Sequence, residues 1–478
     1  MEKKPKYLWK YVNPNKYQLH VTNSKPTTKS EDSDEKIVYM EDLEKRKQVY
    51  GICGECNEPG TGERWCQPCN AKRFKDNFKN WTSRNKVIDE FIQKSQLNSV
   101  HHEKYLEWIP FEKFQNITYI AEGGFGKVYS AGWSEGHIKY WDIENQIWCR
   151  DNWDKYALKS LNDSSDISSN FLNEITSHLQ IYLYDVINCY GITQHPDTKE
   201  YMMVLNFCNK GNLRNYINKS KKYISYKTKI GYLQKIARGL SDIHNAEKVH
   251  KDFHSGNILI MGSPYISDLG MCQPASKQTA KEEGIYGVLP YMAPEVLRGR
   301  QYTKASDVYS FGTIMNEFLS EEIPYNDIPH DQFLAIKICN GLRPDISKDI
   351  PKLLVDLIIK CWDAEIENRP TAKELYQLLT KWNNELQNVK NVEDRKSNEI
   401  CSQVDEYDEI GEKKFKSRSN EDDKSKNIQT HPQAIYTSRL LNFNNLPKPV
   451  NSSTFQFDSA NPVSVQLDES DLDEFWQQ

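Results

Sequence analysis

The chain has 478 residues, with 62 Lys and Arg against 67 Asp and Glu, which gives a formal net charge of −5. This small acidic balance gives no indication of nucleic-acid binding. Hydrophobic residues make up 38% of the chain and the mean hydropathy is −0.77, so we expect one packed region with polar tails.

The sequence contains no apolar run long enough to span a membrane, and its first residues lead into no signal-peptide core. Four of the eleven cysteines are grouped near the N-terminal end and seven are scattered. An odd count with that scatter argues against a disulfide framework and for reduced thiols. We therefore expect a cytoplasmic or nuclear location.

The first part of the chain, residues 1–48, is rich in polar residues without sustained periodicity, which predicts a disordered tail. Residues 50–70 follow with two Cys-x2-Cys pairs separated by nine residues, formed by Cys53, Cys56, Cys66 and Cys69. Four thiolates at this spacing can hold one structural Zn²⁺. The alternative is a redox Cys-x2-Cys pair, but the βαβ pattern that usually accompanies one is missing.

Residues 71–110 are predicted to be a connector, because apolar residues between 71 and 97 repeat at helical spacing. Residues 114–382 carry the dense apolar pattern of a packed core. Beyond residue 386 the composition is polar again, and we expect 386–478 to be mostly disordered.

Within 114–382, strand-like alternation dominates up to about residue 205 and surrounds one helix at 170–180. Helical runs dominate afterwards, for example at 228–245, 304–319, 331–339 and 350–362. This order predicts an α+β fold in which a small β-rich lobe precedes a larger helical lobe.

A glycine-rich segment, Ala121–Val128, lies between two strand-like runs at 117–120 and 127–131. Glycines at a hairpin tip let backbone N–H groups approach phosphates, although most such hairpins are only turns. Lys159 then ends a strand, and Glu174 on the following helix can orient its ammonium group. Taken alone, this pair could equally be an ordinary surface ion pair.

The segment His250–Asn257 is followed eleven residues later by Asp268-Leu269-Gly270. Residues 258–260 and 265–267 are predicted to be short strands joined by a turn. This hairpin would bring Asn257 and Asp268 together, and two oxygen ligands at one point suit a hard cation such as Mg²⁺. Asp252 is suitably spaced to orient a hydroxyl nucleophile.

The ordered series of glycine loop, Lys, helical Glu, His-x-Asp…Asn and Asp-x-Gly resembles a eukaryotic protein kinase catalytic domain, over residues 114–382. The resemblance implies a two-lobed fold, ATP and Mg²⁺ as cofactors, and protein substrates. Asp252 would be the catalytic base, Asn257 and Asp268 would hold Mg²⁺, and Lys159, paired with Glu174, would bind the ATP phosphates. The remaining nucleotide contacts would come from Ala121, Gly123, Gly124, Gly126, Val128, Ala157, the gatekeeper Leu205, and the hinge residues Asn206 and Cys208.

The resemblance extends to the end of the activation segment, residues 287–295. It implies that Glu295 pairs with Arg369 and that Asp307 braces the catalytic loop. The catalytic-loop residues 252–257 and the ending 289–295 look most like the tyrosine-kinase-like branch. Its combination with a four-cysteine segment resembles a kinase group expanded in root-symbiotic fungi.

Four positions depart from the usual kinase pattern. Ala121 replaces the first loop glycine, and Lys251 replaces an Arg that normally grips an activation-loop phosphate. His254 stands where Ser/Thr kinases place Lys, and Val288 where they usually carry Thr. Ser/Thr specificity is our interpretation, with Tyr or dual specificity and a non-catalytic pseudokinase scaffold as alternatives. Available activation-loop phosphorylation sites are Ser276, Thr279 and Tyr286.

Two other segments could contact partners. The tryptophan-rich insertion 133–155 is predicted to be a hairpin that packs on the small lobe, with a partner surface as the alternative. The acidic string 468–476 carries apolar anchors and could be a docking peptide, although most such strings are solvated tail. The zinc segment could also recruit a protein partner.

Overall fold

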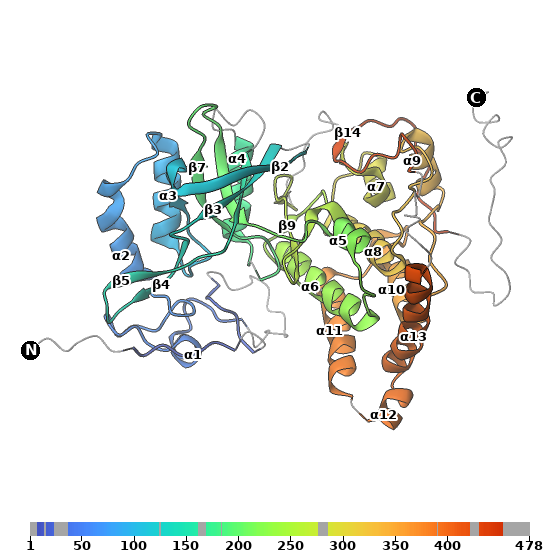
Figure 1. The fold of residues 1–478 in the computed structure, drawn as a ribbon, viewed down its shortest axis with the longest axis horizontal. Coiled ribbons are helices and arrows are strands. Elements are labelled where there is room, and N and C mark those ends of the chain that lie inside the picture. The colour runs from blue at the N-terminus through green and yellow to red at the C-terminus, as the bar shows by residue number, and fades with distance from the viewer. Residues whose placement is uncertain are drawn as a thin grey trace, which may run out of the picture. The chain divides into compact units, whose positions relative to one another are not determined.

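The computed structural model describes residues 7–13, 16–22, 37–123, 126–160, 169–182, 184–275, 285–389, 391–420 and 430–452. The chain divides into two compact units (Figure 1), and each is described by itself. The first comprises Met1–Gly211 and Leu259–Cys272, and the second comprises Asn212–Ile258 and Gln273–Gln478. Within the described ranges, no helix has both the length and the apolar character needed to cross a membrane.

The first unit is built around a six-stranded sheet in the order β1-β7-β8-β6-β3-β2. β1 runs parallel to β7, and the other neighbours are antiparallel. Every residue of β6 and β8 is buried, as expected for strands in the middle of a sheet. The strands are β1 (Glu107–Trp108), β2 (Phe114–Gly123), β3 (Gly126–Trp133), β6 (Tyr156–Ser160), β7 (Cys189–Gln194) and β8 (Tyr201–Asn206).

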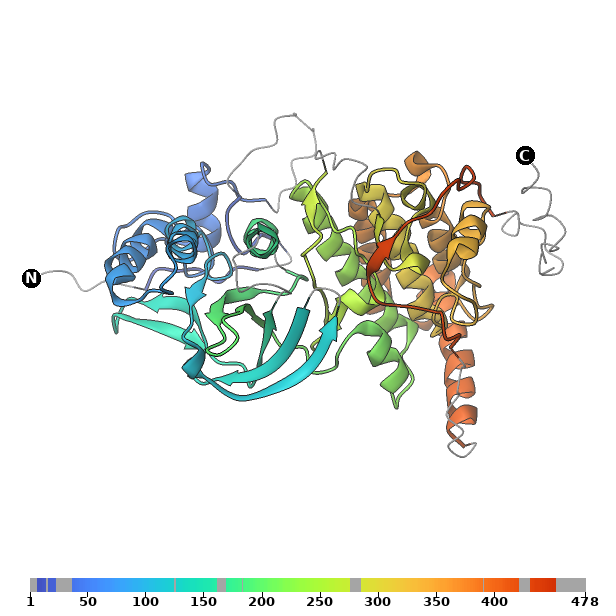
Figure 2. The ribbon, with the colours of Figure 1, turned by 90° about the horizontal axis from the view of Figure 1, so that it is seen from above.

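The helices α3 (Lys86–Asn98) and α4 (Ser169–Gln180) lie on the same side of this sheet (Figure 2). Ile88 and Ile92 of α3 share one buried cluster with Phe171 and Ile175 of α4 and with sheet residues such as Met203. All five of these side chains are fully buried. The helix that carries Glu174 is therefore packed against a helix from outside the predicted core region.

The connector is not one helix over 71–97 as expected. The structure has α2 (Gln67–Asn77), a short 3₁₀ turn (Phe78–Asn80) and then α3. Asn85 caps α3, because its side chain accepts hydrogen bonds from the backbone N–H groups of Val87 and Ile88. The polar residues between the two helices favour a cap over a continuous helix.

The N-terminal segment expected to be disordered is in part packed. Val12, Val21 and Val38 are buried against Val49 and Tyr50 at the end of α1 (Leu43–Tyr50). The prediction of disorder for 1–48 is therefore wrong for the described stretches. These valines lie far apart in sequence, so their contacts leave no local periodicity.

The insertion forms a hairpin of β4 (His137–Asp142) and β5 (Ile147–Asp151), as expected. Its aromatic packing differs from the expectation. Trp148 stacks on Phe74 with ring centroids 5.1 Å apart and on Trp65 at 6.0 Å, so it packs against the four-cysteine region. Trp133 is the tryptophan of this segment that packs in the small lobe.

The second unit is mainly helical and is centred on α8 (Lys304–Ser320), of which all residues from Ser306 to Leu319 are buried. Thr303 begins α8 with a capping box that includes Ser306. The other helices are α5 (Leu213–Lys219), α6 (Tyr226–Asn245), α7 (Pro294–Leu297), α9 (Gln332–Cys339), α10 (Lys352–Cys361) and α11 (Ala372–Asn388). The small β-rich lobe and larger helical lobe confirm the predicted α+β class.

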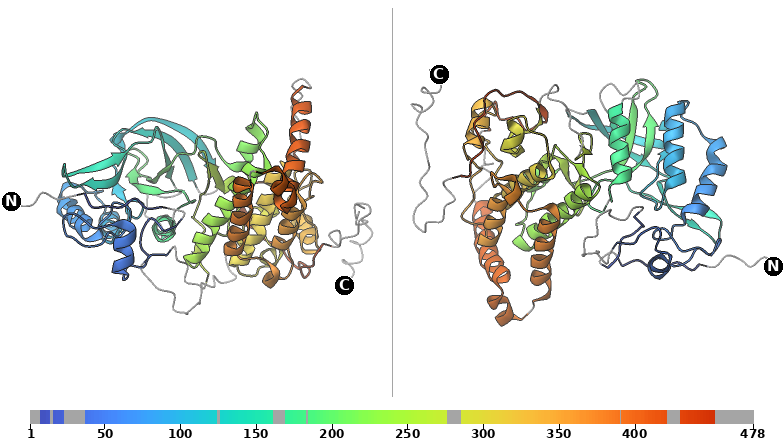
Figure 3. Two further views of the ribbon diagram at one scale, coloured as in Figure 1. Left: turned by 90° about the horizontal axis from the view of Figure 1, so that it is seen from below. Right: turned by 180° about the vertical axis from the view of Figure 1, so that it is seen from behind.

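The C-terminal region is more structured than expected. It forms α12 (Val392–Ser397), α13 (Glu399–Asn420) and the strand β14 (Arg439–Leu441), and Figure 3 shows α12 joining α11 to α13. The Asp408 carboxylate accepts hydrogen bonds from the Tyr226 backbone N–H at 2.7 Å and from the Tyr223 hydroxyl at 2.9 Å. The prediction of disorder is wrong for these residues, while the acidic string 468–476 lies outside the described residues.

Candidate active site

The predicted phosphate loop forms the tip of the β2–β3 hairpin in the first unit. Ala121 pairs with Val128 and Gly123 pairs with Gly126, while Gly124 lies outside the described residues. Gly126 has φ of 145°, a backbone conformation that residues with a Cβ rarely adopt. The glycine at this position is therefore required by the backbone.

Lys159 is the centre of a buried ion triad in the same unit. Its Nζ lies 2.8 Å from Glu174 Oε1 and 2.9 Å from Asp268 Oδ1. Burial alone would lower the pKa of Lys159, but the two carboxylates raise it above its ordinary value, so the ammonium stays charged. The side chains of Lys159 and Glu174 are 10% and 1% exposed, which excludes the ordinary surface ion pair.

The contact from Lys159 to Asp268 was not expected from the sequence. Asp268 has a left-handed backbone with φ of 60°, which is uncommon for a residue other than glycine and costs energy. Two residues later, a Cβ on Gly270 would lie 3.1 Å from Glu174 Oε2 and 3.3 Å from Asp268 Oδ1. A glycine there therefore leaves room for both carboxylates.

The residues expected around adenine share one apolar cluster in the first unit. Ala157 and Leu205 belong to its buried core, and Val128 and Cys208 pack against it. Leu259 also packs against this cluster, although sequence reasoning did not select it. Its position in the sequence, two residues after Asn257, could have indicated that it lies near the nucleotide contacts.

The hinge residues differ in their surroundings. Asn206 is buried, and its Nδ2 donates a hydrogen bond to the Tyr190 hydroxyl at 2.8 Å while its Oδ1 accepts one from the Asn188 backbone N–H at 2.9 Å. Burial raises the pKa of the Cys208 thiol to about 12, so this cysteine stays protonated at neutral pH. The Asn206 side chain therefore fixes the hinge within the small lobe.

Asp252 lies in the predicted catalytic loop of the second unit, which follows β9 (Lys248–Val249) and leads into β10 (Ile258–Ile260). It is only 3% exposed, and burial alone would raise its pKa. The neighbouring His254, together with a hydrogen bond from Ser438, nevertheless holds the pKa of Asp252 below its ordinary value. A carboxylate that remains ionised is suited to accept a proton.

His254 presents a defined ring nitrogen to this carboxylate. Its Nδ1 accepts a hydrogen bond from the Gly256 backbone N–H at 3.1 Å, so in the neutral ring the proton is on Nε2. Nε2 lies 3.6 Å from Asp252 Oδ2. The histidine that replaces the usual lysine therefore directs an N–H group towards the Asp252 carboxylate.

Asp307 braces the loop that carries Asp252. Its carboxylate accepts hydrogen bonds from the backbone N–H groups of His250 at 2.8 Å and Lys251 at 3.1 Å, and it contacts His244 Nε2 at 2.9 Å. These bonds hold Lys251 in a left-handed conformation with φ of 69°. The strain at Lys251 is thus compensated by a buried carboxylate.

Asn257 contacts Asp252 directly. Its Nδ2 donates a hydrogen bond to the Asp252 carbonyl oxygen at 2.9 Å. In an amide side chain the oxygen, here Oδ1, is the atom that can bind a hard metal ion. The predicted hairpin is present as β10 and β11 (Pro264–Ile266). Asn257 and Asp268 belong to different units, so their pairing around Mg²⁺ stays a prediction.

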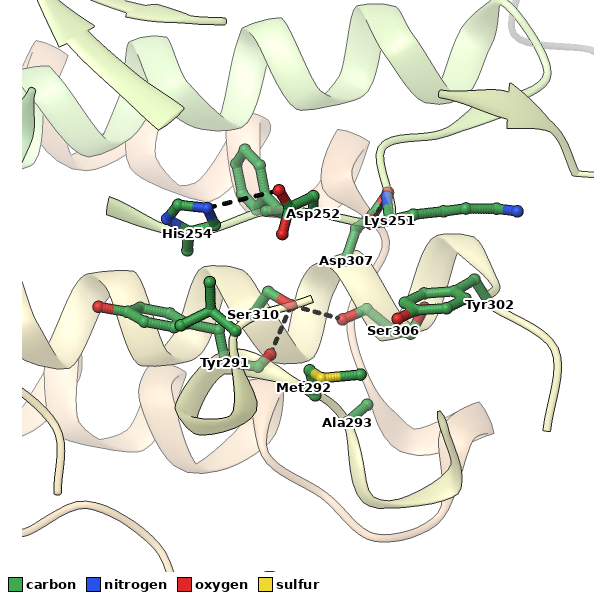
Figure 4. Close-up of a pocket in the computed structure, with 12 residues that line it drawn as sticks. Lys251, Asp252, His254, Tyr291, Met292, Ala293, Tyr302, Ser306, Asp307 and Ser310 are labelled. Atoms are coloured by element: carbon green, nitrogen blue, oxygen red, sulfur yellow. Dashed lines mark hydrogen bonds and ion pairs between the residues drawn. The ribbon is translucent and has the colours of Figure 1, made fainter. Parts of the chain in front are cut away.

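The short helix α7 is fixed within the helical unit by a buried ion pair. Arg369 Nη1 and Nη2 donate to the two Glu295 oxygens at 2.7 and 2.8 Å, and both side chains are at most 2% exposed. Figure 4 shows a small pocket that Tyr291, Met292 and Ala293 line together with the catalytic-loop residues Asp252 and His254. Ser310 Oγ on α8 lies 2.7 Å from the Tyr291 carbonyl oxygen.

Sequence reasoning missed a polar network beside this pocket. Arg214 Nε lies 2.9 Å from Glu317 Oε1, and the Tyr291 hydroxyl donates to Glu317 Oε2 at 2.5 Å. The Ser255 hydroxyl lies 3.1 Å from the same Tyr291 oxygen. The network connects the catalytic loop with α5 and α8, and no local pattern in the sequence could have indicated it.

The activation-segment residues are described only in part. Ser276 and Thr279 lie outside the described residues, and Tyr286 lies in β13 (Ile285–Gly287). Lys251 Nζ donates to Gln273 Oε1 at 2.6 Å and lies over the Tyr302 ring at 5.7 Å. Both of these contacts of Lys251 are with neutral side chains. Val288, the other departure in this region, is buried.

The four N-terminal cysteines converge on one point. The sulfur atoms of Cys53, Cys56, Cys66 and Cys69 all lie within 4.8 Å of one another. The Cys53–Cys69 and Cys56–Cys66 separations are 3.9 and 3.6 Å. A tetrahedral site with Zn–S bonds of about 2.3 Å requires sulfur separations of roughly 3.8 Å. The cluster therefore fits zinc in geometry and in donor type.

Buried groups hold the two halves of the cysteine cluster in place. Cys66 is the N-cap of α2, which puts Cys69 in the first helical turn. The Arg46 guanidinium donates to the carbonyl oxygens of Gly60, Met40 and Pro59 at 2.7 to 3.0 Å. The Arg46 side chain thus anchors the loop between the cysteine pairs by binding its backbone carbonyl groups.

We predict that the purified chain contains about one zinc ion per molecule, and that Cys69→Ser lowers this content and the unfolding temperature. Loss of one thiolate opens a four-ligand site, and zinc bound only to the folded state stabilises it. Elemental analysis and thermal unfolding measure both effects. Cys149→Ser removes a half-buried thiol outside the cluster and serves as the control; equal zinc contents in the two variants would contradict the assignment.

Comparison with known proteins agrees with this geometry. The family model for protein tyrosine and serine/threonine kinases matches residues 114–379, which is more than half of the chain. The chain belongs to this protein kinase family.

Similar curated proteins include serine/threonine-protein kinases from a plant and an amoeba. The chain is 29% identical over 280 residues to serine/threonine-protein kinase VIK of Arabidopsis thaliana, which covers 56% of this chain and 60% of the relative. It is 27% identical over 274 residues to serine/threonine-protein kinase pakC of Dictyostelium discoideum, covering 56% of this chain and 53% of the relative. The chain thus matches little more than half the length of these relatives.

Proposed function

We propose that this chain transfers the γ-phosphoryl group of ATP to serine and threonine hydroxyls of protein substrates in signal transduction. The observation that supports it most is the buried triad of Lys159, Glu174 and Asp268, with Nζ at 2.8 and 2.9 Å from the two carboxylates. Asp252 and Asn257 accompany it in the catalytic loop. A pseudokinase scaffold would usually have lost one of these groups.

In the proposed mechanism, Asp252 orients the substrate hydroxyl and accepts its proton, and Asp307 holds the loop in position. Lys159 binds ATP phosphate oxygens while Glu174 fixes its position, and the β2–β3 tip covers those phosphates. Ala121, Val128, Ala157 and Cys208 would surround the nucleotide. Positioning and electrostatic stabilisation contribute most of the rate in phosphoryl transfer.

Asn257 Oδ1 and the Asp268 carboxylate would hold Mg²⁺, which supplies neutralisation of phosphate charge when it is bound. Both are oxygen donors, as a hard cation requires. Lys159 lies 2.9 Å from Asp268, so a cation suited to phosphate oxygens lies beside a carboxylate suited to a metal ion.

The names of the relatives support Ser/Thr specificity, since both are serine/threonine-protein kinases. Membership of the tyrosine-kinase-like branch, and likeness to the expanded fungal group, stay predictions from residues 252–257 and 289–295 and from the four-cysteine segment. The zinc segment is proposed as a structural module with a surface for a protein partner. A cytoplasmic or nuclear location likewise stays a prediction.

We expect wild-type protein with Mg²⁺ and γ-labelled ATP to label both itself and myelin basic protein, and Lys159→Ala to lose this labelling. Removing the ammonium takes away the group that contacts the phosphates and leaves Glu174 buried without its partner. Retained ATP binding by wild type without any labelling would favour the scaffold. Lys155→Ala, a change at the β6 end of the insertion, provides the control for a nearby lysine.

A further inference from the structure

The C-terminal segment 430–452 lies on the helical unit as an added strand beside the activation segment. Its β14 pairs antiparallel with β13, with Leu441 opposite Ile285, Leu440 opposite Tyr286 and Arg439 opposite Gly287. Figure 1 shows β14 beside α7 and α9. An extended peptide that pairs with an exposed strand is a common mode of peptide recognition.

This register delivers a serine hydroxyl to the catalytic base. Ser438, directly before β14, has its Oγ 2.5 Å from Asp252 Oδ2 and 3.4 Å from His254 Nε2. The Tyr286 hydroxyl donates to the Ser438 carbonyl oxygen at 3.1 Å and fixes the backbone there. A group that abstracts a proton must lie within hydrogen-bond reach of it, and Asp252 does.

Side chains before Ser438 are held in built contacts. The Tyr436 ring lies over the Arg214 guanidinium at 4.2 Å and meets the His330 ring edge-on at 4.8 Å. Its hydroxyl donates to the Pro324 carbonyl oxygen at 2.8 Å. His330 also binds the backbone of this segment, because its Nδ1 accepts a hydrogen bond from the Ile435 N–H at 3.1 Å. A residue two positions before the serine is thus recognised specifically.

Contacts after Ser438 hold the segment further along the unit. Leu441 and Leu446 are at most 9% exposed. The Val450 backbone N–H donates to the Cys339 carbonyl oxygen at 3.0 Å, and Asn451 Oδ1 accepts from the Ala364 N–H at 2.7 Å. The segment therefore binds along its length, with Ser438 as the residue whose side chain meets the base.

We propose that Ser438 is an autophosphorylation site and that residues 431–446 are an intramolecular substrate bound in the acceptor site of this kinase. The inference rests on the proposed function. A segment that only blocked the site would need no hydroxyl group at this position, whereas a substrate requires one. Among the described residues, the neighbouring Thr437 is exposed and forms no hydrogen bond with Asp252, so the register selects Ser438.

In the proposed step, a bond forms between Ser438 Oγ and the γ-phosphorus of ATP. The bond from that phosphorus to the β,γ-bridging oxygen breaks, and its electron pair leaves with ADP. The hydroxyl proton passes to Asp252 Oδ2. The phosphoserine carries nearly two negative charges beside Asp252, so charge repulsion then favours release of the segment and admits other substrates.

The test uses the full chain with Mg²⁺-ATP, peptide mass mapping of Ser438, and myelin basic protein as an external substrate. We expect phosphate on Ser438, with a first-order rate constant that does not change with protein concentration. An Asp252→Asn chain mixed with wild type should stay unphosphorylated at Ser438. Phosphate appearing on it there would contradict the intramolecular route.

Two variants separate recognition from general effects on folding. Tyr436→Ala removes a cation–π contact and a hydrogen bond, and should slow Ser438 phosphorylation about tenfold. Thr437→Ala is the matched control and should leave that rate unchanged. Equal rates in Tyr436→Ala and Thr437→Ala would contradict specific recognition of Tyr436.

Different results would contradict the Ser438 assignment and the proposed kinase function. Labelled myelin basic protein without phosphate on Ser438 would overturn this inference and leave the proposed kinase function standing. Absence of label from both would contradict the proposed function itself. Ser438→Ala should still label myelin basic protein, because the change removes the internal acceptor and keeps the base.

Discussion

Asp252→Asn should lower the rate of phosphate transfer to myelin basic protein by about 10²- to 10⁴-fold, the range expected for loss of a general base. Asparagine has nearly the same shape but cannot accept the hydroxyl proton. The Asp252 side chain is buried, and its Oδ1 has no hydrogen-bond partner among the described residues. Initial rates with labelled ATP measure the effect.

The comparison requires that the variant remains folded. Asp307 makes the backbone contacts that hold the loop, so Asp252→Asn should keep its unfolding temperature and its ATP binding. Asp197→Asn changes an exposed carboxylate between β7 and β8 and serves as the matched control. Equal incorporation by Asp252→Asn and wild type would refute the role of Asp252.

Arg369→Ala should reduce the free energy of unfolding of the helical unit by ~3–5 kcal/mol, as expected when one partner of a buried ion pair is removed. Glu295 would be left 2% exposed without its two bonds from the guanidinium. The substitution also removes donors to the carbonyl oxygens of Asp363 and Ala305. Denaturant unfolding measures the loss.

The control for this experiment is Lys373→Ala, an exposed cation in the first turn of α11, which should change stability by less than about 0.5 kcal/mol. A double variant, Glu295→Met with Arg369→Met, should be more stable than Arg369→Ala because it leaves no buried unpaired charge. If Arg369→Ala were as stable as Lys373→Ala, the ion pair would contribute nothing to the fold.

The parts of the site that the sequence could predict depend on short, local spacings. Lys159 lies near the end of β6 and Glu174 lies within the following helix α4, and the expected ion pair between them is present. Asp252 and Asn257 are five residues apart in one loop, and they contact each other directly. Asp307 was placed by resemblance to the family, and its bonds to the catalytic loop are present.

The parts that could not be predicted depend on contacts between distant residues. Val12, Val21 and Val38 are buried by packing with one another and with the end of α1, which no periodic pattern indicates. Trp148 packs against Phe74 because the insertion hairpin meets the cysteine region. Likewise, the polar composition after residue 386 predicts disorder, but it does not exclude a segment held by backbone hydrogen bonds.

Ser438 illustrates this limit most clearly. Its sequence neighbourhood, Tyr436 to Leu441, contains no motif that indicates a phosphorylation site. It is 186 residues from Asp252 in the chain. The β13–β14 register and the contacts of Tyr436 bring its hydroxyl to the Asp252 carboxylate.

The central claim is that this chain phosphorylates serine and threonine hydroxyls. Phosphoamino-acid analysis of the wild-type protein after the labelling reaction tests it most directly, since it reports activity and acceptor type together. We expect label in phosphoserine, with Ser438 as one source, and no label in the Asp252→Asn protein. Label confined to phosphotyrosine, or no label despite bound ATP, would contradict it.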